Sequence, residues 1–319
     1  MNQGNLNKWL NVTDLQIPKY FYWKWGENPV WTNELKNGNF CEKIYWKEYN
    51  HNLILIGDYP DDKPYNLNYI NDPNIPLMKS HLQKCIRRKL FTKSVKTGYQ
   101  LINTNFNEFI RRINIIMLED TVIVDSYINL IWIMLAYSTK KWIPQRFHIE
   151  WLLGIIHNLC DIDQSNVYNC NCVSKTSLYI SDLSLDQKSI IYSMQIRKSY
   201  GGLKSDMHMI QNLINNNIIN FRKGNNIIIK PVRRVSLIME FLPYKSFDIS
   251  AVDFHCYPYI IKSIKKKFPQ FFEDEIKNLI WKNRSGINFR KKIPKESTEW
   301  NKIKGYINWL STNILNNLE

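Results

Sequence analysis

The fold class follows from residues 106–137, which read FNEFIRRINIIMLEDTVIVDSYINLIWIMLAY. In the first part, Phe109, Ile113 and Ile116 recur at the three- to four-residue spacing of one helical face. Residues 128–137 are apolar on nearly every side, which is typical of a helix at the centre of a protein. Two such helices joined by a short polar stretch predict packed neighbours in a helical body.

The same period predicts further helices on both sides of this stretch. They cover residues 82–90, 95–102, 147–159, 185–198, 207–219, 250–268, 272–282 and 300–315. Residues 225–230 (NNIIIK) indicate a short strand, because three β-branched side chains follow one another there.

The first 76 residues differ from the rest because aromatic side chains and turns dominate them. Residues 20–25 read YFYWKW, and Asp72-Pro73 ends the segment because a residue before proline avoids the helical region. We therefore expect a mainly α protein, a multi-helix globular body with a small aromatic-rich, β-containing N-terminal segment. Its expected parts are this segment (1–76), a helical lobe (77–160), a polar loop (161–186) and a C-terminal helical lobe with a basic region (187–319).

The charge of the chain is basic and unevenly distributed. It has 43 Lys and Arg against 28 Asp and Glu, a formal charge of +15. Residues 79–99 contain seven basic and no acidic residues, and residues 261–295 contain eleven basic and three acidic residues. These two segments account for the whole excess. A patterned excess of this kind predicts a polyanionic partner, first of all nucleic acid, DNA or RNA.

The sequence does not have the pattern of a secreted or membrane protein. No apolar core follows the first residues, and the run at 127–137 has eleven residues where a membrane span needs about 20. The six cysteines are scattered, which is typical of reduced thiols. We expect an intracellular protein, cytoplasmic or nuclear. Abundant Asn, Ile, Lys and Tyr indicate an AT-rich genome such as that of a large DNA virus, which adds the virion or viral factory as a location.

Four short motifs between residues 78 and 137 resemble a known family. They are KSHLQKCIRR (79–88), FIRRI (109–113), MLED (117–120) and IWIMLA (131–136). Together they resemble the helical C-terminal oligomerisation region of replication-associated recombination protein A (MgsA-type) AAA+ ATPases. Thr121 stands where that family has a glycine, and the ATPase half is absent. The resemblance implies a role beside DNA replication or repair and a tendency to form homo-oligomers, without enzymatic activity.

Residues expected to contact phosphate fall into three groups. They are Lys84, Arg87 and Arg88; Arg197, Lys198 and Lys204; and Arg284, Asn288, Arg290 and Lys291. The first group is expected to turn away from the apolar face of its helix. The second surrounds Gly201-Gly202 before a helix start, where free N–H groups bind anions. The third accompanies Trp281 and Phe289, which are suited to base stacking. A glycine helix cap and a solvated basic surface are the structural alternatives.

Other chemistry is less favoured by the sequence. The turn after Gly202 lacks the glycine pattern of a nucleotide-hydrolysing loop, so we expect no such activity. Asp253 and His255 are candidates for an acid–base pair, although Asp253 at a helix start is equally suited to capping. The spacing of His157, Cys160, Cys170 and Cys172 resembles a zinc set only loosely, and we expect no metal and no cofactor.

These observations favour a non-catalytic nucleic-acid-binding accessory protein for DNA replication, repair or packaging. Two alternatives stay open. One is an enzyme that acts on a nucleic acid or nucleotide through Asp253 and His255. The other is a structural or virion-assembly protein whose basic surface binds acidic partners.

Overall fold

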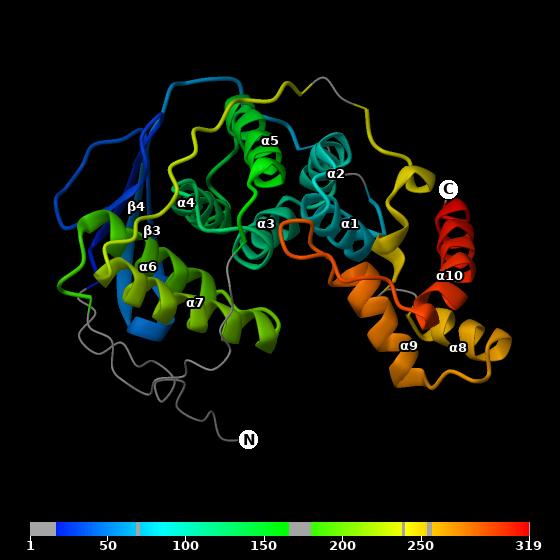
Figure 1. The fold of residues 1–319 in the computed structure, drawn as a ribbon. Helices are drawn as coiled ribbons and strands as arrows, with labels where there is room; N and C mark the ends of the chain where they lie inside the picture. Colours follow the sequence, from blue (N-terminus) through cyan, green and yellow to red (C-terminus); the bar gives the residue numbers. More distant parts are fainter. Residues whose placement is uncertain (1–16, 68–70, 166–179, 238–239, 254–256, 319) are drawn as a thin grey trace, which may run out of the picture. The chain divides into compact units, whose positions relative to one another are not determined.

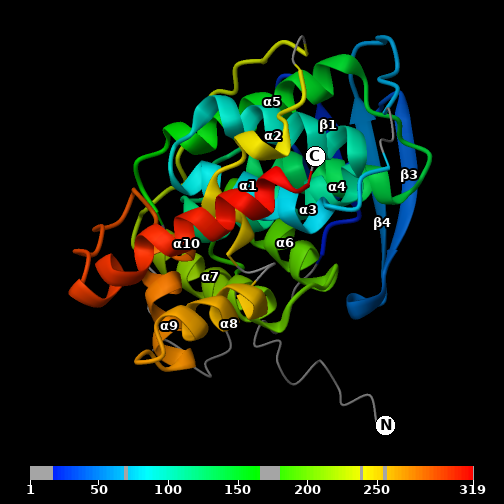
Figure 2. The same ribbon diagram turned by 90° about the vertical axis from the view of Figure 1, so that its right-hand side faces the viewer.

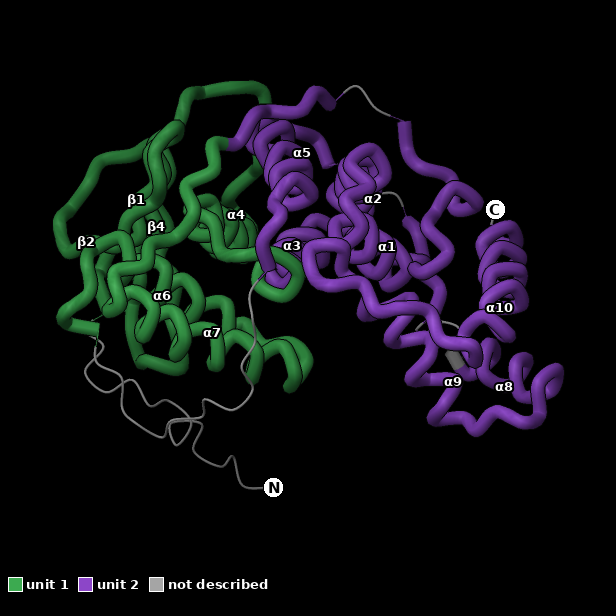
Figure 3. Tube along the Cα trace, viewed as in Figure 1, with its two compact units in different colours: residues 1–64, 117–144, 166–231 green, residues 65–116, 145–165, 232–319 purple. Residues whose placement is uncertain are grey.

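The structure is a computed structural model that describes residues 17–67, 71–165, 180–237, 240–253 and 257–318. These residues form a mainly helical fold with a four-stranded sheet near the N-terminus (Figure 1), as predicted. The chain divides into two compact units, each assembled from three separate stretches (Figure 3). Unit 1 comprises residues 1–64, 117–144 and 166–231, and unit 2 comprises residues 65–116, 145–165 and 232–319. These interleaved stretches differ from the contiguous parts that the sequence suggested.

The sheet of unit 1 is formed by the aromatic N-terminal segment. Its strands are β1 (Tyr20–Lys24), β2 (Val30–Thr32), β3 (Phe40–Trp46) and β4 (His51–Asp58), in the order β2-β1-β4-β3. β1 runs parallel to β4, whereas the other two neighbouring pairs are antiparallel. Aromatic and β-branched residues favour such a half-buried pleated surface, which confirms the predicted β-containing segment.

Three helices complete unit 1: α4 (Tyr127–Ser138), α6 (Leu185–Ser199) and α7 (Lys204–Arg222). α4 and α6 pack against the sheet and each other, and α7 packs against α6 (Figure 1). Residues 127–136 of α4 are all buried, which confirms that this apolar helix is central. Ser184 directly precedes α6, and its side chain accepts a hydrogen bond from the backbone N–H of Gln187 and thereby caps the first turn.

Trp132 links α4 to the parallel strands β1 and β4 through hydrogen bonds. Its indole Nε1 donates to the carbonyl of Phe21 in β1 at 3.3 Å and to that of Ile56 in β4 at 3.1 Å. The ring also lies directly over Gly57, where a Cβ atom would come within 2.9 Å of two ring carbons. The glycine is therefore required for this close approach.

Unit 2 contains four helices from the middle of the chain and the C-terminal elements. The helices are α1 (Ile75–Arg87), α2 (Phe91–Thr104), α5 (Arg146–Asp161) and most of α3 (Phe106–Asp120). The C-terminal elements are two short 3₁₀ turns, η3 (Tyr244–Ser246) and η4 (Ile249–Val252), then α8 (Tyr257–Lys267), α9 (Glu273–Ile280), the π-turn η5 (Trp281–Ser285) and α10 (Thr298–Asn316). α1, α2 and α5 pack on one another, and η4 packs against both α1 and α10.

Two sequence predictions need correction. The helix expected over residues 250–268 is not continuous: η4 ends at Val252, and α8 begins at Tyr257. Pro258 explains the new start, because proline fits the first turn of a helix but not its interior. Among the described residues, the strand expected over residues 225–230 is reduced to an isolated parallel bridge between Ile228 and Val124.

Replacing Trp132 with Phe tests how α4 is fastened to the sheet. The variant keeps an aromatic ring but loses the N–H shared by two carbonyls, so we expect the free energy of unfolding to fall by about 1–3 kcal/mol. Urea unfolding followed by circular dichroism measures the change. Trp309→Phe, at an exposed tryptophan, is the matched control and should change the midpoint little. Equal effects in both variants would contradict the role assigned to Trp132.

Candidate nucleic-acid interface

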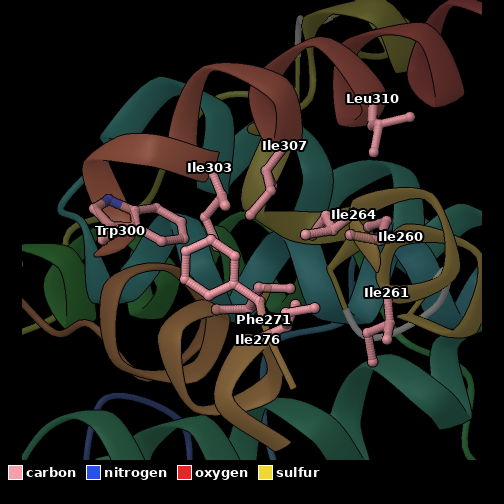
Figure 4. Close-up of a cluster of buried hydrophobic side chains, with 10 residues drawn as sticks. Ile260, Ile261, Ile264, Phe271, Ile276, Trp300, Ile303, Ile307 and Leu310 are labelled. Atoms are coloured by element: carbon pink, nitrogen blue, oxygen red, sulfur yellow. The ribbon is translucent and has the colours of Figure 1, made fainter. Parts of the chain in front are cut away.

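Residues 257–318 form a helical cluster with a core of its own, called here the C-terminal cluster. In it, α8, α9 and α10 lie side by side in two perpendicular views (Figures 1 and 2). Trp300, Ile303 and Ile307 follow one face of α10 and point toward α8 and α9 (Figure 4). Isoleucines of α8 and α9, Phe271 and Leu310 fill the rest of this core. Because the apolar side chains turn inward, the polar residues of all three helices face outward.

Lysines dominate the exposed residues of this cluster. Within residues 262–295, all of which the structure describes, eight lysines are exposed: Lys262, Lys265, Lys266, Lys267, Lys282, Lys291, Lys292 and Lys295.

The three acidic residues in the same range are engaged in the first turn of α9. Glu273 and Asp274 form ion pairs with Lys277 at 2.9 and 3.2 Å, and Glu275 accepts a hydrogen bond from the backbone N–H of Phe272 at 3.2 Å. They therefore act within their own helix, at its first turn and on Lys277.

Exposed aromatic rings accompany the lysines. Trp281 is 52% exposed, Phe289 46% and Trp309 56%, although large rings are usually buried. Tyr259 is also exposed, and it shares a face of α8 with Lys262 and Lys266, three and seven residues further on. Cationic side chains attract a polyanion, and exposed aromatic side chains can stack on flat rings that the polyanion carries.

Between α9 and α10 the chain is fixed by a buried ion pair. The Arg284 guanidinium donates from Nη1 to Asp253 at 3.2 Å and to Ser311 Oγ at 3.4 Å, and from Nη2 to Asn308. The hydroxyl of Ser285 donates to the other carboxylate oxygen of Asp253 at 3.2 Å. The side chain of Asp253 has no exposed surface, so this pair links η4, η5 and α10 inside unit 2.

Burial governs the electrostatics of Asp253. It raises the pKa of the carboxyl from 3.8 to about 6, and the neighbouring Arg284 guanidinium opposes this rise. A carboxylate held in this way acts as an anchor for Arg284. Its predicted partner in an acid–base pair, His255, lies outside the described residues.

Arg290 joins the same segment to the ends of two helices. Its Nε donates to the carbonyl of Ile162 at 2.6 Å, and its Nη1 donates to that of Ile86 at 2.7 Å. Its Nη2 donates to the carbonyls of Leu159 and Cys160. These acceptors lie at the C-terminal ends of α1 and α5, where carbonyls lack helical partners and the helix dipole is negative. One side chain therefore caps both helices.

Two arginines at the C-terminal end of α1 donate hydrogen bonds to the segment that follows α9. Arg87 Nη1 donates to the carbonyl of Ser285, and Arg88 Nη2 donates to that of Arg284. The backbone N–H of Phe289 in turn donates to the carbonyl of Arg87 at 3.1 Å. Reciprocal bonds thus hold residues 284–290 against α1.

The first basic group, Lys84, Arg87 and Arg88, is less exposed than the sequence predicted. Lys84 and Arg87 are buried, and Lys84 donates to Ser80 at 2.7 Å, whereas the sequence predicted an outward, acid-free face. Carbonyl groups of the chain satisfy Arg87 and Arg88, because a segment about 200 residues further on covers this face. Asn288 is also buried, and its side chain accepts from the backbone N–H of Arg290 at 2.9 Å.

The second basic group lies in unit 1 at the turn between α6 and α7. Arg197 is buried and donates to the carbonyl of Gly201 at 3.0 Å, and Lys198 donates to Gln211 at 2.6 Å. Gly201 and Gly202 have φ values of +72° and +149°, which favour glycine. Of the three cations predicted here, Lys204 alone is exposed, so this turn resembles the glycine cap given as the structural alternative.

The zinc set can be compared with the structure only in part. Cys170 and Cys172 lie outside the described residues. Cys160 is buried beside Ser94 Oγ, at 3.0 Å, and burial raises the pKa of its thiol to about 11, which disfavours the thiolate that binds metal. His157 is exposed and contacts the ring of Phe91. Among the described residues, His, Cys, Asp and Glu form no group of three able to hold a metal ion.

The predicted residues thus separate into an internal and an external set. Trp281, Phe289, Lys291 and Lys204 are exposed, whereas the predicted arginines mostly bind the chain's own carbonyls. Sequence reasoning did not single out Tyr259 or Trp309, and it included the lysines of α8 only as part of the basic segment 261–295. The run Lys265-Lys266-Lys267 was the available signal for the lysines, since three consecutive cations cannot all turn inward.

No family model matches this chain, and neither a curated protein nor a solved structure does. Within the part of the chain that the structure describes, no helix has the length and apolar character needed to cross a membrane.

Replacing Arg284 with Met should destabilise unit 2 by about 3–5 kcal/mol, because Asp253 would remain buried without its partner. The double variant Arg284→Met/Asp253→Leu removes both charges and should recover most of this loss. Urea unfolding of the three proteins at pH 7 measures the differences. If the single and double variants were equally unstable, the ion pair would not be the reason for the loss.

The pKa of Asp253 predicts a pH dependence of stability. Because the folded-state pKa lies above the ordinary value, the carboxyl favours the folded state below about pH 4 and loses this contribution as the pH rises through 6. Relative to Asp253→Asn, the wild-type protein should therefore become less stable between pH 4 and 7, by at most about 3 kcal/mol. Urea unfolding of both proteins across this range provides the test. A constant difference would contradict it.

Proposed function

We propose that this protein binds nucleic acid through the exposed lysines and aromatic rings of the C-terminal cluster, as an accessory protein in DNA replication, repair or packaging. The observation that carries the proposal is a separation of roles among cations. Arg87 and Arg290 donate to carbonyl groups of the chain and Arg284 donates to Asp253, whereas the eight lysines are exposed. The cluster therefore offers positive charge on a backbone that is already fixed.

Lysine suits this role because its ammonium group is a compact charge on a flexible stem. Each phosphate that a lysine neutralises releases condensed counterions from the nucleic acid, and this release drives binding that is independent of sequence. The acids of the same range act within α9 and do not compete for the lysines. The resemblance of residues 78–137 to a replication-associated family also favours a partner of this kind.

The proposal concerns binding rather than turnover. Asp253, which an enzymatic mechanism would use, is buried and bound to Arg284 and Ser285. A carboxylate in this position has its oxygens occupied by groups of the chain itself. This arrangement favours the accessory role over the enzymatic alternative.

Salt-dependent binding of three proteins tests the proposal. They are the wild type, the triple variant Lys262→Gln/Lys265→Gln/Lys266→Gln of α8, and Lys43→Gln/Lys47→Gln/Lys223→Gln, a control with the same loss of charge in unit 1. Affinity for labelled DNA and RNA strands and duplexes is measured by fluorescence anisotropy between 50 and 200 mM salt. The logarithm of the affinity should fall linearly with the logarithm of the salt concentration, and the α8 variant should lower this slope by about 2–3.

The control variant should keep nearly the wild-type slope, because its lysines lie elsewhere. Failure of the wild type to bind any of the four nucleic acids would overturn the proposal. Equal losses in both triple variants would show that total charge, and not the C-terminal cluster, determines binding.

A further inference from the structure

The exposed ring of Trp281 is held in place before any ligand arrives. The backbone N–H of Gly286 donates to the carbonyl of Trp281 at 2.7 Å, which closes the π-turn. The indole lies against Gly286, where a Cβ atom would come within 3.0 Å of Cε2 and 3.2 Å of Nε1. Part of the ring thus packs on the glycine, while 52% of the residue remains exposed.

The turn that carries this ring is itself anchored. Arg284 and Ser285, inside the π-turn, are buried and bound to Asp253. A ring on such a backbone has little rotational freedom left to lose on binding, and a ligand that stacks on it gains the contact at low entropic cost.

A second exposed ring of the C-terminal cluster, that of Trp309, is held by stacking on a neighbouring ring. On α10, Trp309 stacks on Tyr306 with ring centroids 5.6 Å apart and planes inclined by 13°. Lys267 places its ammonium group 4.2 Å from the Tyr306 centroid. Lys302 lies four residues before Tyr306, on the same face of the helix. This face therefore combines a fixed, 56% exposed indole with two lysines.

An exposed indole next to lysines distinguishes between forms of nucleic acid. In a duplex, both faces of each base are covered by neighbouring bases, and the outside offers phosphates and base edges. In a single strand the base faces are accessible, and stacking on an aromatic side chain stabilises binding for every type of base. Lysines alone would bind both forms, so the ordered tryptophans favour the single strand.

We propose that the C-terminal cluster binds single-stranded nucleic acid, an inference that rests on the proposed function. Trp281 and Trp309 stack on the bases, and the neighbouring lysines bind the phosphates. Because every base has a flat face, the interface should tolerate any sequence. The ligand class is a polynucleotide with unpaired bases.

The test compares three DNA ligands of equal length in fluorescence anisotropy at one salt concentration. They are a 20-nucleotide strand of mixed sequence, its blunt duplex, and an abasic strand with the same phosphates and no bases. The wild type should bind the strand with bases at least tenfold more tightly than the abasic strand. Trp281→Leu and Trp309→Leu should each weaken binding of the base-containing strand by roughly 5- to 100-fold and leave binding of the abasic strand unchanged.

Two further variants separate stacking from a loss of folding. Trp281→Phe retains a ring and should recover part of the affinity. Gly286→Ala leaves Trp281 in the sequence but adds a methyl group 3.0 Å from both its ring and its carbonyl oxygen, so it should displace the ring and weaken strand binding as Trp281→Leu does, provided that its urea unfolding midpoint stays that of the wild type. Tyr45→Leu, at an exposed ring of unit 1, is the control and should bind as the wild type does.

The outcomes separate this inference from the proposed function. Absence of binding to all three DNA ligands, together with absence of binding to the RNA strand and duplex of the salt titration, would overturn the proposed function. Equal affinity for the base-containing and abasic strands, or tighter binding of the duplex, together with unchanged binding by Trp281→Leu, would overturn the stacking inference alone. In that case the protein would bind phosphates through its lysines without contacting the bases.

Discussion

A buried guanidinium group must find an acceptor for its N–H groups, and this requirement organises much of unit 2. Arg284 meets it with Asp253, and Arg290 meets it with carbonyls at the ends of α1 and α5. Arg87 and Arg88 meet it with carbonyls of the segment after α9. The planar fork of arginine carries five N–H donors in a fixed geometry and can satisfy several fixed acceptors at once. The arginines therefore fix the path of residues 284–290.

The position of this segment determines what the C-terminal cluster exposes. The backbone of residues 284–290 is bound to α1, and the Arg290 side chain binds the end of α5. The exposed side chain of Phe289 within this segment, and those of Trp281 and Lys282 just before it, therefore have a fixed support. The core beneath α8, α9 and α10 has the same effect on the lysines of α8. Positive charge is thus divided between arginines that maintain the fold and lysines that face solvent, and the net charge of +15 alone does not reveal this division.

Sequence reasoning located the helices better than it located their partners. Trp300, Ile303 and Ile307 follow a helical period that local reasoning recognises, and α10 lies where it was expected. The surroundings of Arg87 depend on Ser285, 198 residues away, and no local pattern carries that information. A charged residue opposite an apolar face is usually solvated, so Arg87 and Arg284 were placed at the surface. The prediction of a basic, aromatic region at 261–295 needed composition alone, whereas the separate roles of its cations required the fold.

The order of the segments along the chain has a consequence for biosynthesis. Unit 1 obtains its last segment only when residue 231 has been made, and unit 2 needs residues 232–319 to complete a body begun at residue 65. At about 5–20 residues per second, the ribosome takes roughly 9–35 s to go from residue 58, the end of β4, to residue 231. Neither unit can finish folding before residue 231 has been made. The carbonyl acceptors of Arg87 and Arg88, at residues 284 and 285, are made later still. The nascent chain therefore contains the apolar helix α4 without the last segment of its unit while residues 139–231 are being made.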